Sequence, residues 1–492
     1  MAAGLGTRMK SHTPKVLHPL AGRPMLGYVL DAARSVTGVE PVVVYSPATA
    51  AICDAFAGQA RFALQDEPRG TGDAVRAGLA AVPDDVAEIL VLSADVPRVQ
   101  ATTLHDLLEA RRLDAAVMSL VAVDAYDPGE LGRVIRTAGG SVDRIVEAVD
   151  ATDEERAVTE INAGIYAFDG GWLRDRIGSL RPSPASGELY LTELVALARA
   201  EGRLVTAIEV EDDGRLTGIN DRSQLAQAEW DLRAELNQAH MRAGVTMVDP
   251  STAYIEPGVE LAEDVVLEPN VVLRGRTRIG QGTVIGAGSQ LVDSVVGRAC
   301  RIWASVLEAA EVDDECEIGP FAHLRAGSSI GRGARLGNFA EVKNSRLGPG
   351  VQQHHVSYLG DADVGARTNV GAGTITANYD GARKYRTTIG EHVFLGVDTM
   401  LRAPVTLGDE SKTGAGAVVT HDVPPGTLAV GMPARIRTPR PAREDQPAAA
   451  DARERDKARD NADAAEPPPR PRATPSPAGD TPPTDRGADE PA

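Results

Sequence analysis

Apolar residues follow two different periods along the chain. Up to about residue 220, short apolar runs rich in β-branched residues, such as 42–45 and 89–92, alternate with amphipathic stretches, such as the helical spacing over 25–33. Runs of this kind suit strands that are buried on both faces of a sheet. The pattern predicts a Rossmann-like α/β domain over residues 1–220, doubly wound around a parallel sheet.

A single helix is predicted after this domain. Over 223–243, apolar residues recur at near-heptad spacing with charged residues between them, and Gly244 follows. Because glycine commonly stops a helix, we expect a linker helix within residues 221–244.

A six-residue period begins at Ile255 and governs the next part of the chain. The first seven aliphatic positions fall six apart without a slip, and the series resumes after short breaks: Ile255, Leu261, Leu267, Leu273, Ile279, Ile285 and Leu291, then Val312 to Val342, Val364 and Val370, and Ile389 to Leu407. Hexapeptide arrays form parallel β-helices, whose repeated aliphatic residue points into a narrow core. An aromatic content of only 4% agrees with such a core. We therefore expect a parallel β-helix over residues 245–440 rather than a repetitive surface region.

The six-residue period lapses twice, near 347–359 and near 374–388. Insertions in a solenoid form loops on one side, often the binding side. We therefore expect chemistry at the polar residues of these lapses, which are His354, His355, Tyr358, Asn378, Tyr379 and Lys384.

Composition narrows the classes of function. The formal net charge is −19, which disfavours the basic surface of a nucleic-acid binder, and no apolar run approaches the roughly 20 residues of a membrane span. Three scattered cysteines suit neither a disulfide framework nor a zinc site. We expect a cytoplasmic protein without nucleic-acid partners or membrane insertion. Residues 441–492 contain no large apolar residue, so we expect a disordered tail there.

A glycine-rich turn with two cations behind it opens the chain. It reads Ala2-Ala3-Gly4-Leu5-Gly6-Thr7-Arg8, and Lys15 follows at Pro14-Lys15. Glycines let backbone N–H groups approach a polyphosphate, and the two cations can neutralise its charge. Asp95 follows the apolar run 89–92, so it is expected at the carboxyl edge of the sheet, where a carboxylate can bind Mg²⁺. For either feature alone, an ordinary loop is the alternative.

The complete N-terminal string resembles the signature of sugar-nucleotide pyrophosphorylases, Gly-x-Gly-Thr-Arg followed by Pro-Lys. Over residues 2–430 the chain resembles the family of bifunctional N-acetylglucosamine-1-phosphate uridyltransferases and glucosamine-1-phosphate N-acetyltransferases of bacterial cell-wall synthesis. The resemblance implies a left-handed β-helix and a homotrimer with shared acetyltransferase sites. It also implies acetyl-CoA-dependent N-acetylation of glucosamine 1-phosphate, then Mg²⁺-dependent uridylyl transfer from UTP to the product, with release of pyrophosphate.

The same resemblance assigns roles in the N-terminal half. Arg8 and Lys15 would be catalytic, by neutralising the phosphates, and Asp95 and Asn220 would bind Mg²⁺. Gln65 and Thr71 would read the uracil. The positions implied to bind UTP or the nucleotide sugar are Ala2, Ala3, Gly4, Lys15, Gln65, Gly70, Thr71, Gly132, Glu147, Asn162 and Asn220. Leu131 stands where the family commonly has Tyr, beside the sugar positions Gly132, Glu147 and Asn162.

In the C-terminal half, His355 lies in a string that resembles the family's His-x-x-Tyr-x-Gly-Asp. It would be the base that takes the amine proton, although the neighbouring His354 leaves an exchange of roles open. The residues implied to bind glucosamine phosphate are Arg325, Lys343, Tyr358 and Asn369. Those implied to bind acetyl-CoA are Ala372, Asn378, Tyr379, Lys384, Val397 and Ala415, with Val397 where the family often has Ser.

Two other functions fit parts of the sequence. One is a nucleotidyltransferase whose β-helix serves only as a scaffold, and the other is a non-catalytic interaction protein with a degenerate N-terminal domain. A glycine-rich phosphate turn normally follows a central strand, and Met1 stands where that strand should end. We expect a gap in the sheet and a native start about five or six residues upstream.

Overall fold

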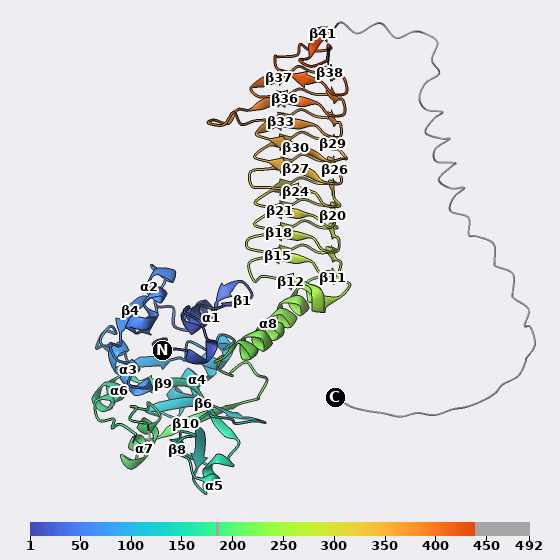
Figure 1. The fold of residues 1–492 in the computed structure, drawn as a ribbon. Helices are drawn as coiled ribbons and strands as arrows, with labels where there is room; N and C mark the ends of the chain where they lie inside the picture. Colours follow the sequence, from blue (N-terminus) through green and yellow to red (C-terminus); the bar gives the residue numbers. More distant parts are fainter. Residues whose placement is uncertain (184–185, 438–492) are drawn as a thin grey trace, which may run out of the picture. The chain divides into compact units, whose positions relative to one another are not determined.

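The computed structural model describes residues 1–183 and 186–437 (Figure 1). The predicted tail at 441–492 lies outside the described residues. Among the helices of the described ranges, none is both long and apolar enough to cross a bilayer.

The N-terminal part is built on a mixed sheet of six strands, with β10, β6, β9, β7 and β8 in this order and β5 also paired with β9. The strands are β5 (Glu88–Val91), β6 (Met118–Asp124), β7 (Arg133–Arg136), β8 (Val142–Val146), β9 (Glu160–Asp169) and β10 (Val205–Val210). The prediction of a parallel sheet is wrong for most of these pairs, because β9 runs antiparallel to β5, β6 and β7. The apolar runs indicate that a strand is buried on both faces. They do not indicate its direction, because parallel and antiparallel strands can both be buried in this way.

Helices cover both faces of this sheet. The helices of this part are α1 (Met25–Thr37), α2 (Ala51–Ala55), α3 (Thr71–Leu79), α4 (Ala101–Leu113), α5 (Asp153–Arg156), α6 (Gly170–Ile177) and α7 (Glu193–Ala200). Leu104 and Leu107 of α4 pack with Val121 on one face. Leu173 of α6 and Leu194 of α7 belong to a second core on the other face. The helix predicted over 223–243 is α8 (Arg222–Arg242).

A gap separates β5 from the parallel pair β3 (Val42–Tyr45) and β4 (Arg61–Leu64), which form a sheet of their own. The first residues of the chain bridge it. The Ala2 N–H donates to the carbonyl of Val44 at 2.8 Å, and the Met1 ammonium donates to the carbonyl of Leu92 at 2.7 Å. The expected gap in the sheet is confirmed, whereas the upstream start stays a prediction.

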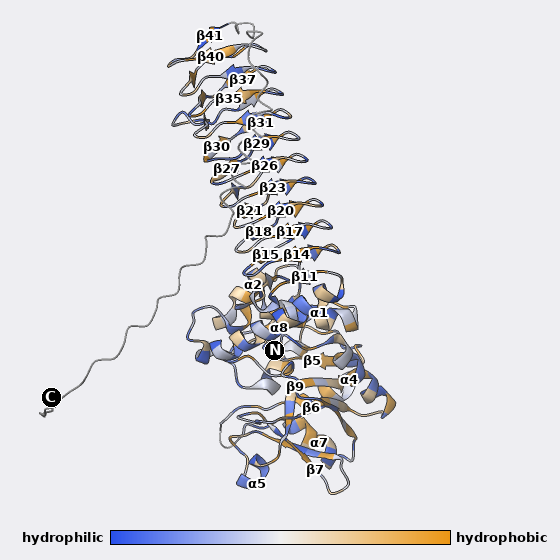
Figure 2. Cartoon of the chain, turned by 90° about the vertical axis from the view of Figure 1, so that its right-hand side faces the viewer, coloured by the Kyte–Doolittle hydropathy of each residue, from blue (hydrophilic) through white to orange (hydrophobic). Residues whose placement is uncertain are grey.

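From β11 (Thr246–Met247) to β40 (Leu428–Val430), the chain winds into a parallel β-helix, and β41 (Arg435–Arg437) then pairs antiparallel with β40. With β41 included, the three sheets have 12, 10 and 9 strands. Its coils are stacked along one axis in Figure 1, and hydrophobic colour recurs from coil to coil in Figure 2. The inward positions predicted from the six-residue period are buried, except that Leu261 is half-buried. The period therefore located the core residue by residue.

The two lapses of the period have different causes. Through the first, the coil continues without insertion, because Leu347, Gln353 and Leu359 keep the spacing of six and all point inward. The expectation of an inserted loop is wrong there. The six-residue pattern was hidden because Gln353 stands where the repeat usually has an aliphatic residue. The second lapse is a true insertion, a loop between β33 (Ile375–Ala377) and β34 (Thr387–Ile389) that projects from the coil in Figure 1.

Candidate active sites

Three residues predicted for the nucleotide site meet around one ammonium group. Lys15 lies in a short 3₁₀ turn, Asp95 follows β5, and Asn220 precedes α8. The Lys15 Nζ donates to Asp95 Oδ2 at 2.6 Å and to Asn220 Oδ1 at 2.9 Å. Only 13% of the Lys15 side chain is exposed, so this charge is poorly screened by water. A half-buried cation and two acceptor oxygens thus converge at the carboxyl edge of the sheet.

The oxygen atoms at this position fit a divalent cation. Mg²⁺ is held in proteins by one or two carboxylates, with phosphates and water completing its shell. Asp95 and Asn220 offer a carboxylate and an amide oxygen that already converge on one cation. Their spacing is set by the backbone, because the Ile219 N–H donates to the Asp95 carbonyl at 2.9 Å.

The glycine-rich turn is folded against Lys15. Gly6 has φ 58°, and a Cβ there would lie 2.6 Å from the Lys15 Cβ, so glycine is required by both conformation and space. A Cβ on Gly4 would meet no atom within 4 Å, which leaves that residue open to a ligand. Arg8 is exposed, and its Nη1 contacts Glu130 Oε2 at 3.1 Å. The structure brings Lys15, but not Arg8, into contact with Asp95.

The residues predicted to read uracil form a second cluster. Gln65 is buried, and its Nε2 donates to Asp73 Oδ2 at 2.9 Å. Gly70 precedes α3 with φ 109°, and a Cβ there would lie 2.6 Å from the Leu189 carbonyl oxygen. The Thr71 hydroxyl accepts from the Leu191 N–H at 2.9 Å. Asp73, which orients the Gln65 amide, was missed in the sequence because a lone Asp in a helix carries no signal.

The three residues predicted to contact the sugar also lie together. The Asn162 N–H donates to the Gly132 carbonyl at 2.9 Å, and a Cβ on Gly132 would lie 3.3 Å from Glu147 Oε2. Burial raises the pKa of the Glu147 carboxyl, while a 2.9 Å hydrogen bond from the Thr192 hydroxyl opposes this shift. The Glu147 carboxyl and the Asn162 backbone thus lie on either side of Gly132.

The raised pKa of Glu147 predicts how a substitution changes stability with pH. An acid whose pKa is raised on folding favours the folded state at low pH, and this contribution is lost as pH rises through the folded pKa. We expect Glu147→Gln to raise Tm more at pH 8 than at pH 4, because the amide is never charged. Thermal melts across this range would measure the effect. Glu154→Gln, at an exposed position of α5, is the control, and equal Tm shifts at both pH values for Glu147→Gln would contradict the prediction.

His355 lies at a corner of the β-helix, between β29 (Gln352–Gln353) and β30 (Ser357–Gly360). Strand register aligns this corner in four successive coils, because Gln352, Asn369, Phe394 and Lys412 are consecutive partners. Each is followed three positions later by a predicted residue: His355, Ala372, Val397 and Ala415. The corners are tied by hydrogen bonds from Asp398 N–H to Ala372 O at 2.7 Å and from Gly416 N–H to Val397 O at 2.8 Å. We call these four residues the corner column.

Both histidines are exposed, but they differ in their hydrogen bonding. His354 donates from Nε2 to Gln352 Oε1 at 2.6 Å, and burial, with smaller effects of His355 and Arg335, lowers its pKa. His355 is exposed at the corner. His354 is thereby held toward its own strand, while His355 begins the corner column.

Three of the four residues predicted to bind glucosamine phosphate lie on one sheet. Arg325 directly follows β24 (His323–Leu324), Lys343 ends β27 (Ala340–Lys343), and Tyr358 lies in β30. Lys343 is the register partner of Gly360, and Arg325 occupies the same position one coil earlier. The Tyr358 hydroxyl lies over Gly360, where it would clash with an added Cβ. Arg325 pairs with Glu341 at 2.9 Å. Asn369, on β32 (Asn369–Val370), lies on a different sheet from these residues.

The inserted loop carries the remaining predicted residues. Asn378 is buried at its base and donates from Nδ2 to the Asp361 carboxylate, which also accepts from Asn344. Tyr379 and Lys384 pair across the loop. Asp361 was missed as a separate contributor, although it ends the quoted His-x-x-Tyr-x-Gly-Asp string.

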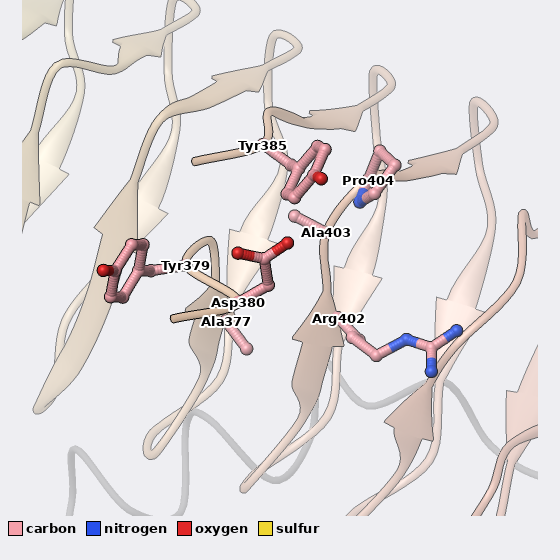
Figure 3. Close-up of a pocket in the computed structure, with 7 residues that line it drawn as sticks. All are labelled: Ala377, Tyr379, Asp380, Tyr385, Arg402, Ala403 and Pro404. Carbon is pink, nitrogen blue, oxygen red and sulfur yellow. The ribbon is translucent and has the colours of Figure 1, made fainter. Parts of the chain in front are cut away.

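A cavity of about 470 Å³ lies where the loop leaves the coil, and Figure 3 shows its lining. Asp380 and Tyr385 point toward one another there, while Tyr379 points away from them. Arg402, from β36 (Met400–Arg402), adds a cation to the wall that the sequence analysis did not identify. Its signal was weak, because Arg402 occupies an ordinary outward position of the repeat.

The corner column and the inserted loop lie at opposite ends of the same sheet. His355 precedes β30, whereas the register partner of Lys343 ends it, five residues later. At roughly 3.3 Å per residue, the backbone separation is at most about 16 Å, since residues 355 and 356 form a bend before β30.

Comparisons with known proteins match both parts of the chain. A family model described as a MobA-like NTP transferase domain matches residues 1–164, and one described as a hexapeptide repeat of succinyl-transferase matches residues 386–421. Three curated relatives are each named "Bifunctional protein GlmU". The relative from Mycolicibacterium vanbaalenii is 44% identical over 438 residues, 87% of this chain and 89% of its own. The relative from Mycobacterium tuberculosis is 43% identical over 438 residues, 87% and 88% of the two chains. The relative from Pelobacter propionicus is 43% identical over 447 residues, 90% and 96% of the two chains.

Proposed function

The chain belongs to the family of bifunctional GlmU proteins, and from this premise we infer that it catalyses two transfers in the synthesis of UDP-N-acetylglucosamine. The β-helix, of the left-handed hexapeptide type, acetylates glucosamine 1-phosphate with acetyl-CoA. The N-terminal α/β part then transfers uridylyl from UTP to N-acetylglucosamine 1-phosphate and releases pyrophosphate.

Uridylyl transfer joins two anions, so charge neutralisation is its main requirement. A phosphate oxygen of the sugar 1-phosphate forms a bond to the α-phosphorus of UTP, and the bond to the pyrophosphate leaving group breaks. The poorly screened Lys15 ammonium supports this step, because the Lys15 side chain lies against the glycine-rich turn and its ammonium contacts Asp95 and Asn220. We propose that Asp95 and Asn220 hold Mg²⁺, which supplies further positive charge to the phosphates.

Acetyl transfer requires a base for the amine and a groove for the thioester. The amine nitrogen of the sugar attacks the thioester carbonyl, its proton passes to His355, and the thiolate of CoA leaves. The corner column is the observation that carries this proposal, since it places His355 directly in line with Ala372, Val397 and Ala415, the residues expected along acetyl-CoA.

We propose that three copies assemble around the β-helices. The support is the hexapeptide-repeat β-helix itself, together with the apolar surface that it exposes near the His355 corner. A neighbouring copy can bring its phosphate-binding face or its inserted loop to the His355 corner. The apolar side chains exposed near this corner, Phe339, Val356, Phe394 and Val397, agree with coverage by another subunit.

The same proposal assigns each of the two transfers to a part of the chain. We place uridylyl transfer on residues 1–220, the linker on 221–244 and acetyl transfer on 245–440. We also place the protein in the cytoplasm, since Cys53, Cys300 and Cys316 are all unpaired thiols.

Two assays of the intact protein test the assignment. We expect release of free CoA from acetyl-CoA and glucosamine 1-phosphate, and release of pyrophosphate from UTP, Mg²⁺ and N-acetylglucosamine 1-phosphate. Pyrophosphate without CoA would show that the β-helix is only a scaffold. Neither product would indicate a non-catalytic interaction protein.

A further inference from the structure

One amide side chain lies fully buried inside the β-helix, next to the His355 corner. Gln353 is 0% exposed, and it occupies the inward position of β29 between Leu336 of the coil before and Val370 of the coil after. An aliphatic residue fits such a position without loss, whereas a buried amide destabilises the fold unless it is hydrogen-bonded. The packing of the coil therefore does not explain why this position holds Gln353.

The Gln353 amide is connected to the backbone of His355 through one hydroxyl group. Gln353 Nε2 donates to Ser357 Oγ at 2.9 Å, and the Ser357 hydroxyl donates to the His355 carbonyl at 2.8 Å. A hydroxyl has a single proton, so while it donates to the carbonyl it can only accept from the amide. In a buried site the two bonds strengthen one another. The three groups thus form one directed chain that ends at the residue proposed as the base.

The same serine contact recurs elsewhere in the β-helix with a different donor. Ser305, like Ser357, donates to the carbonyl two residues before it, at 2.8 Å, and it accepts from the Ala322 N–H of the next coil at 3.1 Å. In the coil after Ser357 the corresponding N–H belongs to Thr374, and it donates within its own turn at 3.2 Å. Gln353 therefore supplies the donor that the next coil does not supply.

The bond between Gln353 and Ser357 closes the corner from inside the coil. Residues 354–356 between them are exposed, and the chain bends there. The corner has one further tie to the next coil, a 2.7 Å hydrogen bond from the Gly373 N–H to the Val356 carbonyl. Because exposed side chains contribute little packing, the conformation of this corner depends on the buried bonds at its two ends.

We propose that Gln353 and Ser357 are positioning residues for His355, a role that rests on the acetyl transfer proposed above. Their bonds fix the backbone of the corner, so that His355 stays in line with Ala372 and the thioester groove. Without the Gln353 N–H the corner gains conformational freedom, and His355 meets the amine correctly in a smaller fraction of complexes. The loss falls on kcat, because the two buried side chains do not form the surface that binds acetyl-CoA.

Gln353→Leu tests this role, because it restores the aliphatic residue of the repeat and removes the donor. We expect a Tm no lower than that of the wild type and unchanged uridylyl transfer. We expect kcat for acetyl transfer to fall about tenfold, while KM for acetyl-CoA changes by less than about twofold. Hydrogen exchange of the 354–356 amides should become about tenfold faster. An amide with only a structural role would give an activity that follows Tm.

Substitutions of Ser357 provide a second test, which does not depend on how the core accepts leucine. Ser357→Ala should lower kcat for acetyl transfer by about tenfold, and Ser357→Thr should restore it, because threonine keeps the hydroxyl. Thr374 and Thr399 occupy the same inward position in the next two coils, so threonine fits this column. Ser305→Ala is the matched control: it removes the same type of bond away from His355, and we expect unchanged acetyl transfer.

Three results would overturn the proposal. They are kcat values within about twofold of the wild type for both Gln353→Leu and Ser357→Ala, an equal loss of kcat in Ser305→Ala, or unchanged exchange of the 354–356 amides. A wild type that releases no CoA would instead contradict the proposed acetyl transfer itself. Hydrogen exchange would still report, in that case, whether Gln353 and Ser357 hold the corner.

Discussion

Lys15→Ala is expected to lower kcat/KM for uridylyl transfer by about 10²- to 10³-fold and to leave acetyl transfer unchanged. The ammonium lies in a poorly hydrated position, where it contacts Asp95 and Asn220 at 2.6 and 2.9 Å. Its removal leaves the Asp95 carboxylate and the Asn220 amide oxygen in place, and it takes away the cation that would meet the incoming phosphates. Pyrophosphate release and CoA release, measured on the same preparation, would separate the two activities.

Lys10→Ala is the matched control for this substitution. Lys10 carries the same charge near the same turn, but it is exposed. We expect it to keep nearly full uridylyl transfer. If the Lys15→Ala protein retained most of its uridylyl transfer, the role of Lys15 would be limited to a structural ion pair. A loss of both activities together with a lowered Tm would indicate misfolding instead of a catalytic defect.

The six-residue period was the most informative signal in the sequence, because each inward position of a narrow coil admits only a small range of residues. It fails where the coil accepts a polar residue. Gln353, Thr376 and Thr413 are buried inward positions, and the Gln353 amide is held by a 2.9 Å bond to the Ser357 hydroxyl. An internal partner, which the sequence does not reveal, makes such a residue acceptable in the core.

Strand direction and site assembly were harder to predict. Apolar runs such as 89–92 report burial on both faces, and they are compatible with the antiparallel pairing of β5 and β9 that the structure shows. Lys15, Asp95 and Asn220 were assigned through motifs far apart in the chain, and the structure brings them into contact. His355 and Lys343 were assigned in the same way, and the structure separates them along β30. The motifs therefore predict which residues take part in the chemistry. Which of these residues lie close together in one subunit depends on the positions of the corners in the coil.

His355→Ala is expected to lower acetyl transfer by about 10²- to 10⁴-fold and to leave uridylyl transfer unchanged, because general-base assistance to the amine is lost. CoA release at saturating acetyl-CoA would measure the loss in kcat. His355 is exposed at the corner, so little change in Tm is expected.

His354→Ala is the control that separates the two histidines. Its Nε2 is already engaged by Gln352 Oε1 at 2.6 Å, and burial lowers its pKa, so it is poorly placed to accept a proton from a substrate in line with Ala372. We expect this variant to retain acetyl transfer within about tenfold of the wild type, the size of a lost positioning contact near 1.4 kcal/mol. If His354→Ala abolished acetyl transfer and His355→Ala did not, the base would be His354. The acetyl donor would then have to approach the β-helix from the side of Gln352, away from the corner column.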